Sequence, residues 1–95
     1  MIKHTAGPWK ENQYSAGYEI YGGEHSKLVA SVAVRRHDDP EGRANSLLIA
    51  AAPELLEALE KCKEAMQAHM KRYGPTPNIV TAENIAADVL AKVRP

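Results

Sequence analysis

The residue types change near Asp38, and this change constrains the fold more than any other feature of the chain. Aromatic, glycine and β-branched residues dominate before it, whereas alanine, leucine, glutamate and lysine dominate after it. The first composition is typical of strands and the second of helices. A chain of 95 residues has room for one hydrophobic core. We therefore predict a single α+β domain over residues 1–95, with strands within about 8–36 and helices within about 40–93.

Three segments before Asp38 have strand-like patterns. Residues 9–14 follow Gly7-Pro8, and residues 18–21 end at Gly22-Gly23, a dipeptide that can take the positive φ of a hairpin turn. Residues 27–36 alternate, and one face of this strand is apolar: Leu28, Ala30, Val32 and Val34. Short connections between the segments predict a three-stranded antiparallel meander. Its apolar face needs helices to cover it.

Helical patterns occupy the second half of the chain. The segment Asp38-Asp39-Pro40-Glu41 begins a helix, because it combines a capping carboxylate with proline and glutamate in the first turn. Apolar positions then recur at alternating intervals of four and three: Leu48, Ala52, Leu55, Leu59, Cys62, Met66, His69 and Tyr73. Pro53 cannot donate to the helix ladder. We therefore predict a short helix to about Ala52 and a longer one from Pro53 to about Tyr73.

A final helix follows the segment Gly74-Pro75-Thr76-Pro77, which stops the long helix. We expect Thr81 to cap this final helix, which returns antiparallel and extends through Val93. Its expected buried face contains Ile85, Val89, Leu90 and Val93. The fold prediction is thus a meander followed by two to three helices that pack on the sheet and on another subunit.

Self-association is expected because the long apolar stripe is more than so small a chain can cover alone. We predict a homo-oligomer whose interface contains six residues of the stripe: Leu55, Leu59, Cys62, Met66, His69 and Tyr73.

Charge and residue counts exclude several classes of function. Twelve basic and twelve acidic side chains cancel, which argues against non-specific nucleic-acid binding. With one cysteine and no two of the four histidines at i, i+4 spacing, we predict no disulfide, no metal and no cofactor. No apolar run approaches the length of a membrane span and no apolar signal core follows Met1, so we expect no membrane contact and a cytosolic location.

Catalytic constellations are not recognisable in the sequence. Cys62 lies on the apolar stripe without a basic neighbour on that face, and the serines lack a nucleophile-elbow context. Helix capping explains the paired carboxylates of Asp38 and Asp39 without acid-base chemistry. We therefore predict that the protein has no catalytic residues, is not an enzyme, and acts by binding.

A possible ligand site lies where the strands give way to the helices. Guanidinium forks suit phosphate oxygens, helix amides add to this attraction, and an aromatic face can stack a base. The predicted ligand-binding residues are Trp9, Arg35, Arg36, His37, Arg43 and Asn45. The alternative interpretation is a solvated strand end whose arginines pair with Asp38, Asp39 and Glu41.

Two longer segments resemble a known family of small phage and prophage proteins. The opening His4-Thr5-Ala6-Gly7-Pro8-Trp9 fits the pattern His-Thr-x-Gly-Pro-Trp. Residues 44–59 fit Ala-Asn-Ala-x-Leu-Ile-Ala-Ala-Ala-Pro-x-Leu-Leu-Glu-Ala-Leu, with Ser46-Leu47 as the departure. The resemblance covers the chain from His4 to about Leu59 and implies a phage gene. It carries no activity that can be transferred residue by residue.

Small non-enzymatic phage proteins often act against host defence, and this analogy shapes the leading hypothesis. It is an oligomeric phage counter-defence protein in the host bacterial cytosol that binds and sequesters a small nucleotide immune signal. The alternative is a protein-protein interaction module that inhibits a host defence protein directly through the exposed faces of its helices. A sequence-specific nucleic-acid regulator is disfavoured by the neutral charge and by the lack of a helix-turn-helix pattern.

Overall fold

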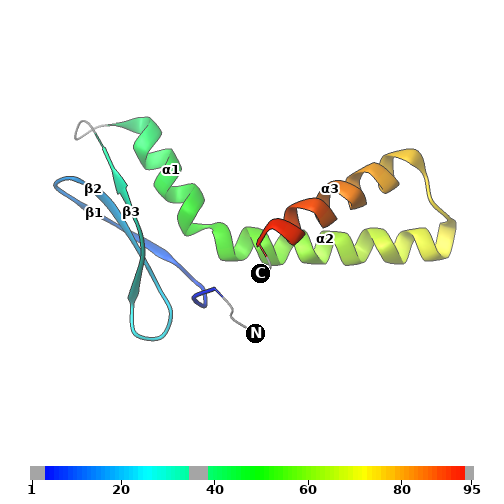
Figure 1. Ribbon diagram of the computed structural model, residues 1–95, viewed down its shortest axis with the longest axis horizontal. Helices are drawn as coiled ribbons and strands as arrows, with labels where there is room; N and C mark the ends of the chain where they lie inside the picture. Colours follow the sequence, from blue (N-terminus) through cyan, green and yellow to red (C-terminus); the bar gives the residue numbers. More distant parts are fainter. Residues whose placement is uncertain (1–3, 35–38, 94–95) are drawn as a thin grey trace. The chain divides into compact units, whose positions relative to one another are not determined.

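Three strands precede three helices in the computed structural model, which describes residues 4–34 and 39–93 (Figure 1). The strands are β1 (Lys10–Tyr14), β2 (Gly17–Gly22) and β3 (Lys27–Ala33). The helices are α1 (Pro40–Ala50), α2 (Ala52–Tyr73) and α3 (Pro77–Val93). The predicted α+β class and the antiparallel meander are therefore confirmed. The chain forms two compact units, one up to Glu54 and one from Leu55, and the prediction of a single domain stays a prediction.

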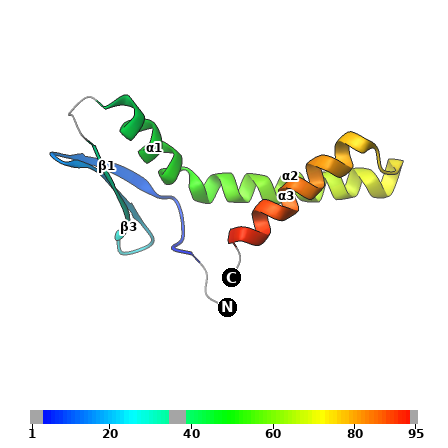
Figure 2. The same cartoon turned by 45° about the horizontal axis from the view of Figure 1, so that its top comes forward.

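The sheet has the order β1-β2-β3, and both pairings are antiparallel. Glu11 lies opposite Ile20, which lies opposite Ala30, so these three side chains share one face of the sheet. Ile20 is fully buried on this face, and α1 lies across the same face (Figures 1 and 2). The core of the first unit therefore lies between the sheet and α1. The opposite face, with Asn12 and Ser31, is exposed.

A register shift between Ile20 and Tyr21 changes the face that one predicted core residue occupies. Leu28 was expected beside Ala30 on the covered face, but it pairs with Tyr21 and is 50% exposed. The prediction was wrong because a bulge inserts one extra residue into β3 and so breaks the strict alternation.

Asp39 begins α1, as the start signal predicted. Its carboxylate accepts hydrogen bonds from the backbone N–H of Glu41 at 3.0 Å and of Gly42 at 3.1 Å. The helix ends at Ala50, and the N–H of the cap residue Ala51 still donates to the carbonyl of Leu47. Because Pro53 has no N–H to continue the ladder, α2 begins anew at Ala52. The predicted break at Pro53 is thus confirmed to within one residue.

The second unit is a helical hairpin in which α3 turns back toward α2 at an angle (Figures 1 and 2). Gly74, with a φ of 85°, ends α2 in the left-handed conformation. The Nε2 group of Gln67 donates to Oε1 of Glu83 at 3.3 Å and links the two helices. Within the described residues, no helix is both long enough and apolar enough to cross a membrane.

The predicted start and buried face of α3 need correction. The helix starts at Pro77 and not at a Thr81 cap, because the N–H of Val80 already donates to the carbonyl of Thr76. Leu90 is buried with 2% exposure, whereas Ile85 is 59% exposed and both Val89 and Val93 are exposed as well. Apolar residues occupy two faces of α3, and periodicity alone did not distinguish the face that meets α2.

Candidate functional site

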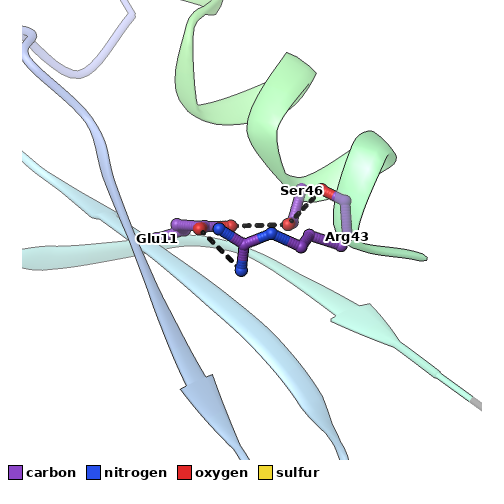
Figure 3. Close-up of polar contacts among 3 residues, drawn as sticks. All are labelled: Glu11, Arg43 and Ser46. Carbon is purple, nitrogen blue, oxygen red and sulfur yellow. Dashed lines mark hydrogen bonds and ion pairs between the residues drawn. The ribbon is translucent and has the colours of Figure 1, made fainter. Parts of the chain in front are cut away.

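A polar cluster joins α1 to the sheet, and Figure 3 shows its three residues. The hydroxyl of Ser46 lies 2.7 Å from a carboxylate oxygen of Glu11 and 2.8 Å from the carbonyl of Arg43. It has a single hydrogen and so donates to one of these acceptors at a time. The guanidinium of Arg43 lies 3.6 Å from the other carboxylate oxygen of Glu11. The cluster therefore satisfies a fully buried serine and fastens α1 to β1.

Small residues on the inner face of α1 explain why the helix lies so close to the sheet. Gly42 and Ser46 are one turn apart, and both are buried. A side chain at Gly42 would collide with Val34, which follows β3. The larger Leu47 and Leu48 consequently point outward and are 46% and 64% exposed. The fully buried positions of this helix are therefore small residues, while both of its leucines face solvent.

The amino-terminal motif lies against the end of the β1–β2 pair. The ring of Trp9 contacts Gly22, where a Cβ atom would collide with it. The indole Nε1 donates to the carbonyl of Thr5 at 2.9 Å, and the His4 ring meets Trp9 edge to face with 6.1 Å between centroids. The N–H of Gly23 donates to the carbonyl of Ala6, which holds this segment to the sheet. The motif thus has a structural role.

The two segments that carry the family resemblance meet in space. Gly7 of the opening motif lies against the ring of Pro53, at the start of α2. Ser46 of the second segment contacts Glu11, two residues after Trp9. Packing between the amino-terminal segment, β1 and the α1–α2 junction therefore accounts physically for several residues of both motifs.

The predicted ligand-binding residues are only partly described. Arg35, Arg36 and His37 lie outside the described residues. Trp9 contacts the amino-terminal segment and β2, Arg43 contacts Glu11 on β1, and Asn45 is exposed on α1. The ligand site therefore stays a prediction.

Two contacts weaken the attraction that this region offers an anion. The carboxylate of Asp39 already accepts from two amides at the start of α1, so a phosphate would have to displace it. The charge of Arg43 is partly offset by the carboxylate of Glu11.

The predicted oligomer interface divides into two rows of side chains on α2. Leu59 and Met66 are half-buried, whereas Leu55, Cys62, His69 and Tyr73 are exposed. At the end of this second row, the His69 ring lies 5.0 Å from that of Tyr73, and the Arg72 guanidinium lies 5.4 Å from the Tyr73 centroid. Whether another subunit covers these residues stays a prediction.

An ionisable contact lies on the uncovered side of the sheet. The hydroxyl of Tyr21 donates to Oε1 of Glu19 at 3.0 Å. This hydrogen bond raises the pKa of the Tyr21 hydroxyl above its usual value, and desolvation adds to the increase. Sequence reasoning did not single out this pair, although i, i+2 spacing in a strand places both side chains on one face.

The Glu11–Ser46 contact and the outward leucines were also missed from the sequence. Alternation along β1 does place Glu11 on the same face as Trp9, and i, i+4 spacing places Gly42 and Ser46 together. If Gly42 and Ser46 are taken as the inner face of α1, the helical periodicity predicts that Leu47 and Leu48 face solvent.

The chain is similar to a known family of phage proteins. The family model described as Salmonella phage P22 protein Y8K6 matches residues 1–94 of the chain. Neither the curated proteins nor the solved structures contain a match.

Within residues 4–34 and 39–93, no three histidine, cysteine, aspartate or glutamate side chains gather closely enough to hold a metal ion.

Proposed function

Since the chain belongs to the family of Salmonella phage P22 protein Y8K6, we propose that it is a phage interaction protein that inhibits a host protein by binding it directly. Membership supports the expectation of a small phage protein family. The mode of action is our proposal. In it, the protein carries out no chemistry of its own.

The outer face of α1 is the observation that carries this proposal. Ala44, Leu47, Leu48 and Ala51 follow the i, i+3, i+4, i+7 spacing of a helix that docks in a groove. Ala44 and both leucines are exposed, so burying them against a partner would stabilise a complex. Because about half of each leucine is already covered, burying the rest would contribute roughly 0.7–2 kcal/mol for each.

The neighbouring polar residues suit the rim of such an interface. Arg43 is half exposed beside the apolar row, and Asn45 lies on the next face of the helix. Polar groups at a rim contribute specificity, while buried apolar anchors supply most of the binding free energy. The contact of Arg43 with Glu11 also holds α1 in place before binding, which reduces the entropy lost on association.

Nucleotide sequestration has less support, because Asp39 occupies amides at the start of α1 and Glu11 pairs with Arg43. Calorimetry against a panel of cyclic and ADP-ribose-derived nucleotides tests it. Heat of binding that disappears in an Arg43→Ala variant would favour sequestration over the interaction proposal.

A pull-down from host lysate tests the interaction proposal. The immobilised wild-type chain should retain one host protein in stoichiometric amount, and Leu47→Glu and Leu48→Glu should lose it. Leu28→Glu is the matched control, because Leu28 has a similar exposure but lies on β3. Retention by both α1 variants, or loss by the Leu28 control alone, would refute the assignment of the surface.

A further inference from the structure

The apolar side chains of α3 form two separate rows. Ala86 and Leu90 are buried and Ile79 is half-buried, and their spacing places them on one face. Ile85, Val89 and Val93 are exposed. At about 100° per residue, this second row lies roughly a quarter turn around the helix from the first. The first row is therefore covered, and the second is not.

Helix α2 is divided in the same way. Its half-buried apolar side chains share one face: Leu56, Leu59, Met66 and Met70. Leu55, Cys62 and His69 are exposed and recur every seven residues, on an adjacent face. No residue of α2 is fully buried. Much of the apolar surface of the helix therefore has no cover within this unit.

The two exposed rows lie on the same side of the hairpin. Gln67 and Glu83 meet across it through their hydrogen bond. In a projection of about 100° per residue, each of them lies on one flank of its helix's covered row, and the exposed row lies on the other flank. Because Gln67 and Glu83 mark one side of the hairpin, both exposed rows belong to the opposite side. We call this side the hairpin face: Leu55, Cys62, His69, Ile85, Val89 and Val93.

The area of the hairpin face is close to what a dimer needs. Helices of 22 and 17 residues can together present a surface of at most about 25–30 Å in length and about 20 Å in width. This amounts to on the order of 600 Å² in projection, and more once the relief of the side chains is included. A standard interface buries about 800 Å² on each partner.

The chemistry of the hairpin face suits a second copy better than a charged partner. None of its six members is an acidic, lysine or arginine residue, whereas Glu57, Glu64 and Lys71 lie on other faces of α2. A mostly apolar face without carboxylates, lysines or arginines can be complementary to itself, as a two-fold interface requires. Two helices with so few buried side chains also gain the missing core when another pair covers them, as in a four-helix bundle.

We propose that two copies of the chain pair through their hairpin faces and form a four-helix bundle. This goes beyond the proposed function, which concerns the outer face of α1. It also changes the interface expected from the sequence, because α3 supplies half of the contact and Leu59 and Met66 lie in the row that faces α3.

Light scattering coupled to size-exclusion chromatography tests the pairing on the full chain. The wild type should have twice the 10.4 kDa chain mass, and Ile85→Glu and Val89→Glu should have the mass of one chain. Val80→Glu is the matched control, since Val80 is an exposed valine on the other flank of α3. It should keep the double mass. Circular dichroism checks that all variants remain helical.

A wild-type monomer at micromolar concentration would overturn the proposal. So would a pair that survives in both face variants, or that is lost equally in the Val80 control.

The thiol of Cys62 provides a second readout that needs no charged substitution. It is exposed in the single chain and lies within the hairpin face. Alkylation of the wild type by a maleimide should slow as the protein concentration rises, because pairing covers the sulfur. In Ile85→Glu the rate should stay fast at all concentrations. A wild-type rate that does not change with concentration, in a sample that light scattering finds paired, would place the interface elsewhere.

Discussion

The hydroxyl of Ser46 is fully buried, so the stability of the first unit depends on its hydrogen bonds. Replacing it with alanine removes the hydrogen bond to the mostly buried carboxylate of Glu11. We expect Ser46→Ala to lower the free energy of unfolding by about 1–2 kcal/mol, after the better helix propensity of alanine offsets a few tenths. Urea denaturation measures this change. The neighbouring exposed Asn45→Ala should stay within about 0.5 kcal/mol of the wild type, and an equal loss in both variants would contradict the role of Ser46.

Tyr21 gives the fold a predictable response to alkaline pH. Its folded pKa is raised, mainly by the hydrogen bond to Glu19, above the value of about 10 in an unfolded chain. The neutral phenol therefore contributes stability that is fully present below about pH 10 and is lost as the pH rises through the folded pKa. Glu19→Gln removes the charge and should lower the Tyr21 pKa. An NMR titration with labelled tyrosine, assigned through Tyr21→Phe, measures it, and equal pKa values in both proteins would contradict the assigned cause.

At the scale of the elements, α1 depends on a glycine that would normally weaken a helix. Gly→Ala inside a helix usually stabilises it by roughly 0.5–1 kcal/mol. At Gly42 the added methyl group would collide with Val34, so we expect Gly42→Ala to destabilise the protein by about 1–3 kcal/mol. Thermal and urea unfolding measure the effect. In a Val34→Ala background the same substitution should cost little or become favourable, and an unchanged penalty there would mean that the collision is not its cause.

The elements with local signals were predictable from the sequence. Asp39 and Pro40 begin α1 because a cap and a fixed φ act within one turn, and Pro53 separates α1 from α2 because its ring removes a donor. Leu28 was misplaced because a bulge has no such local signal. The start of α3 was placed one turn late, at Thr81, although Pro77 is itself a good first residue.

The candidate site was less predictable because its contacts join distant parts of the chain. Glu11 and Ser46 are 35 positions apart, and alternation assigns Glu11 a face without naming its partner. Arg43 is among the residues predicted to bind phosphate, but it lies beside the carboxylate of Glu11, a partner that the sequence did not indicate. Whether Arg35, Arg36 and His37 bind a ligand stays a prediction.

At the scale of the whole molecule, the core is small, so many apolar side chains stay exposed and are available to bind a partner. Ile20 and Leu90 are the largest apolar side chains in the described residues that are fully buried, one in each unit. Leu48 and Ile85 are each more than half exposed. The first belongs to the outer face of α1 and the second to the hairpin face. In the proposed arrangement, one unit binds a host partner and the other holds two copies together. A paired molecule would then present two α1 faces and bind with greater avidity.

Pairing through the hairpin face would couple stability to protein concentration. A dimer gains stability by mass action, so the melting temperature of the wild type should rise when the concentration is increased about a hundredfold. Ile85→Glu should melt lower and lose this dependence, while Val80→Glu should keep it. The hairpin face has no acidic, lysine or arginine members, so added salt should change the slope little, since screening acts on charges. Calorimetric scans over that range measure both effects. A wild-type melting temperature that is constant with concentration would mean that the two helices are stable without a second copy.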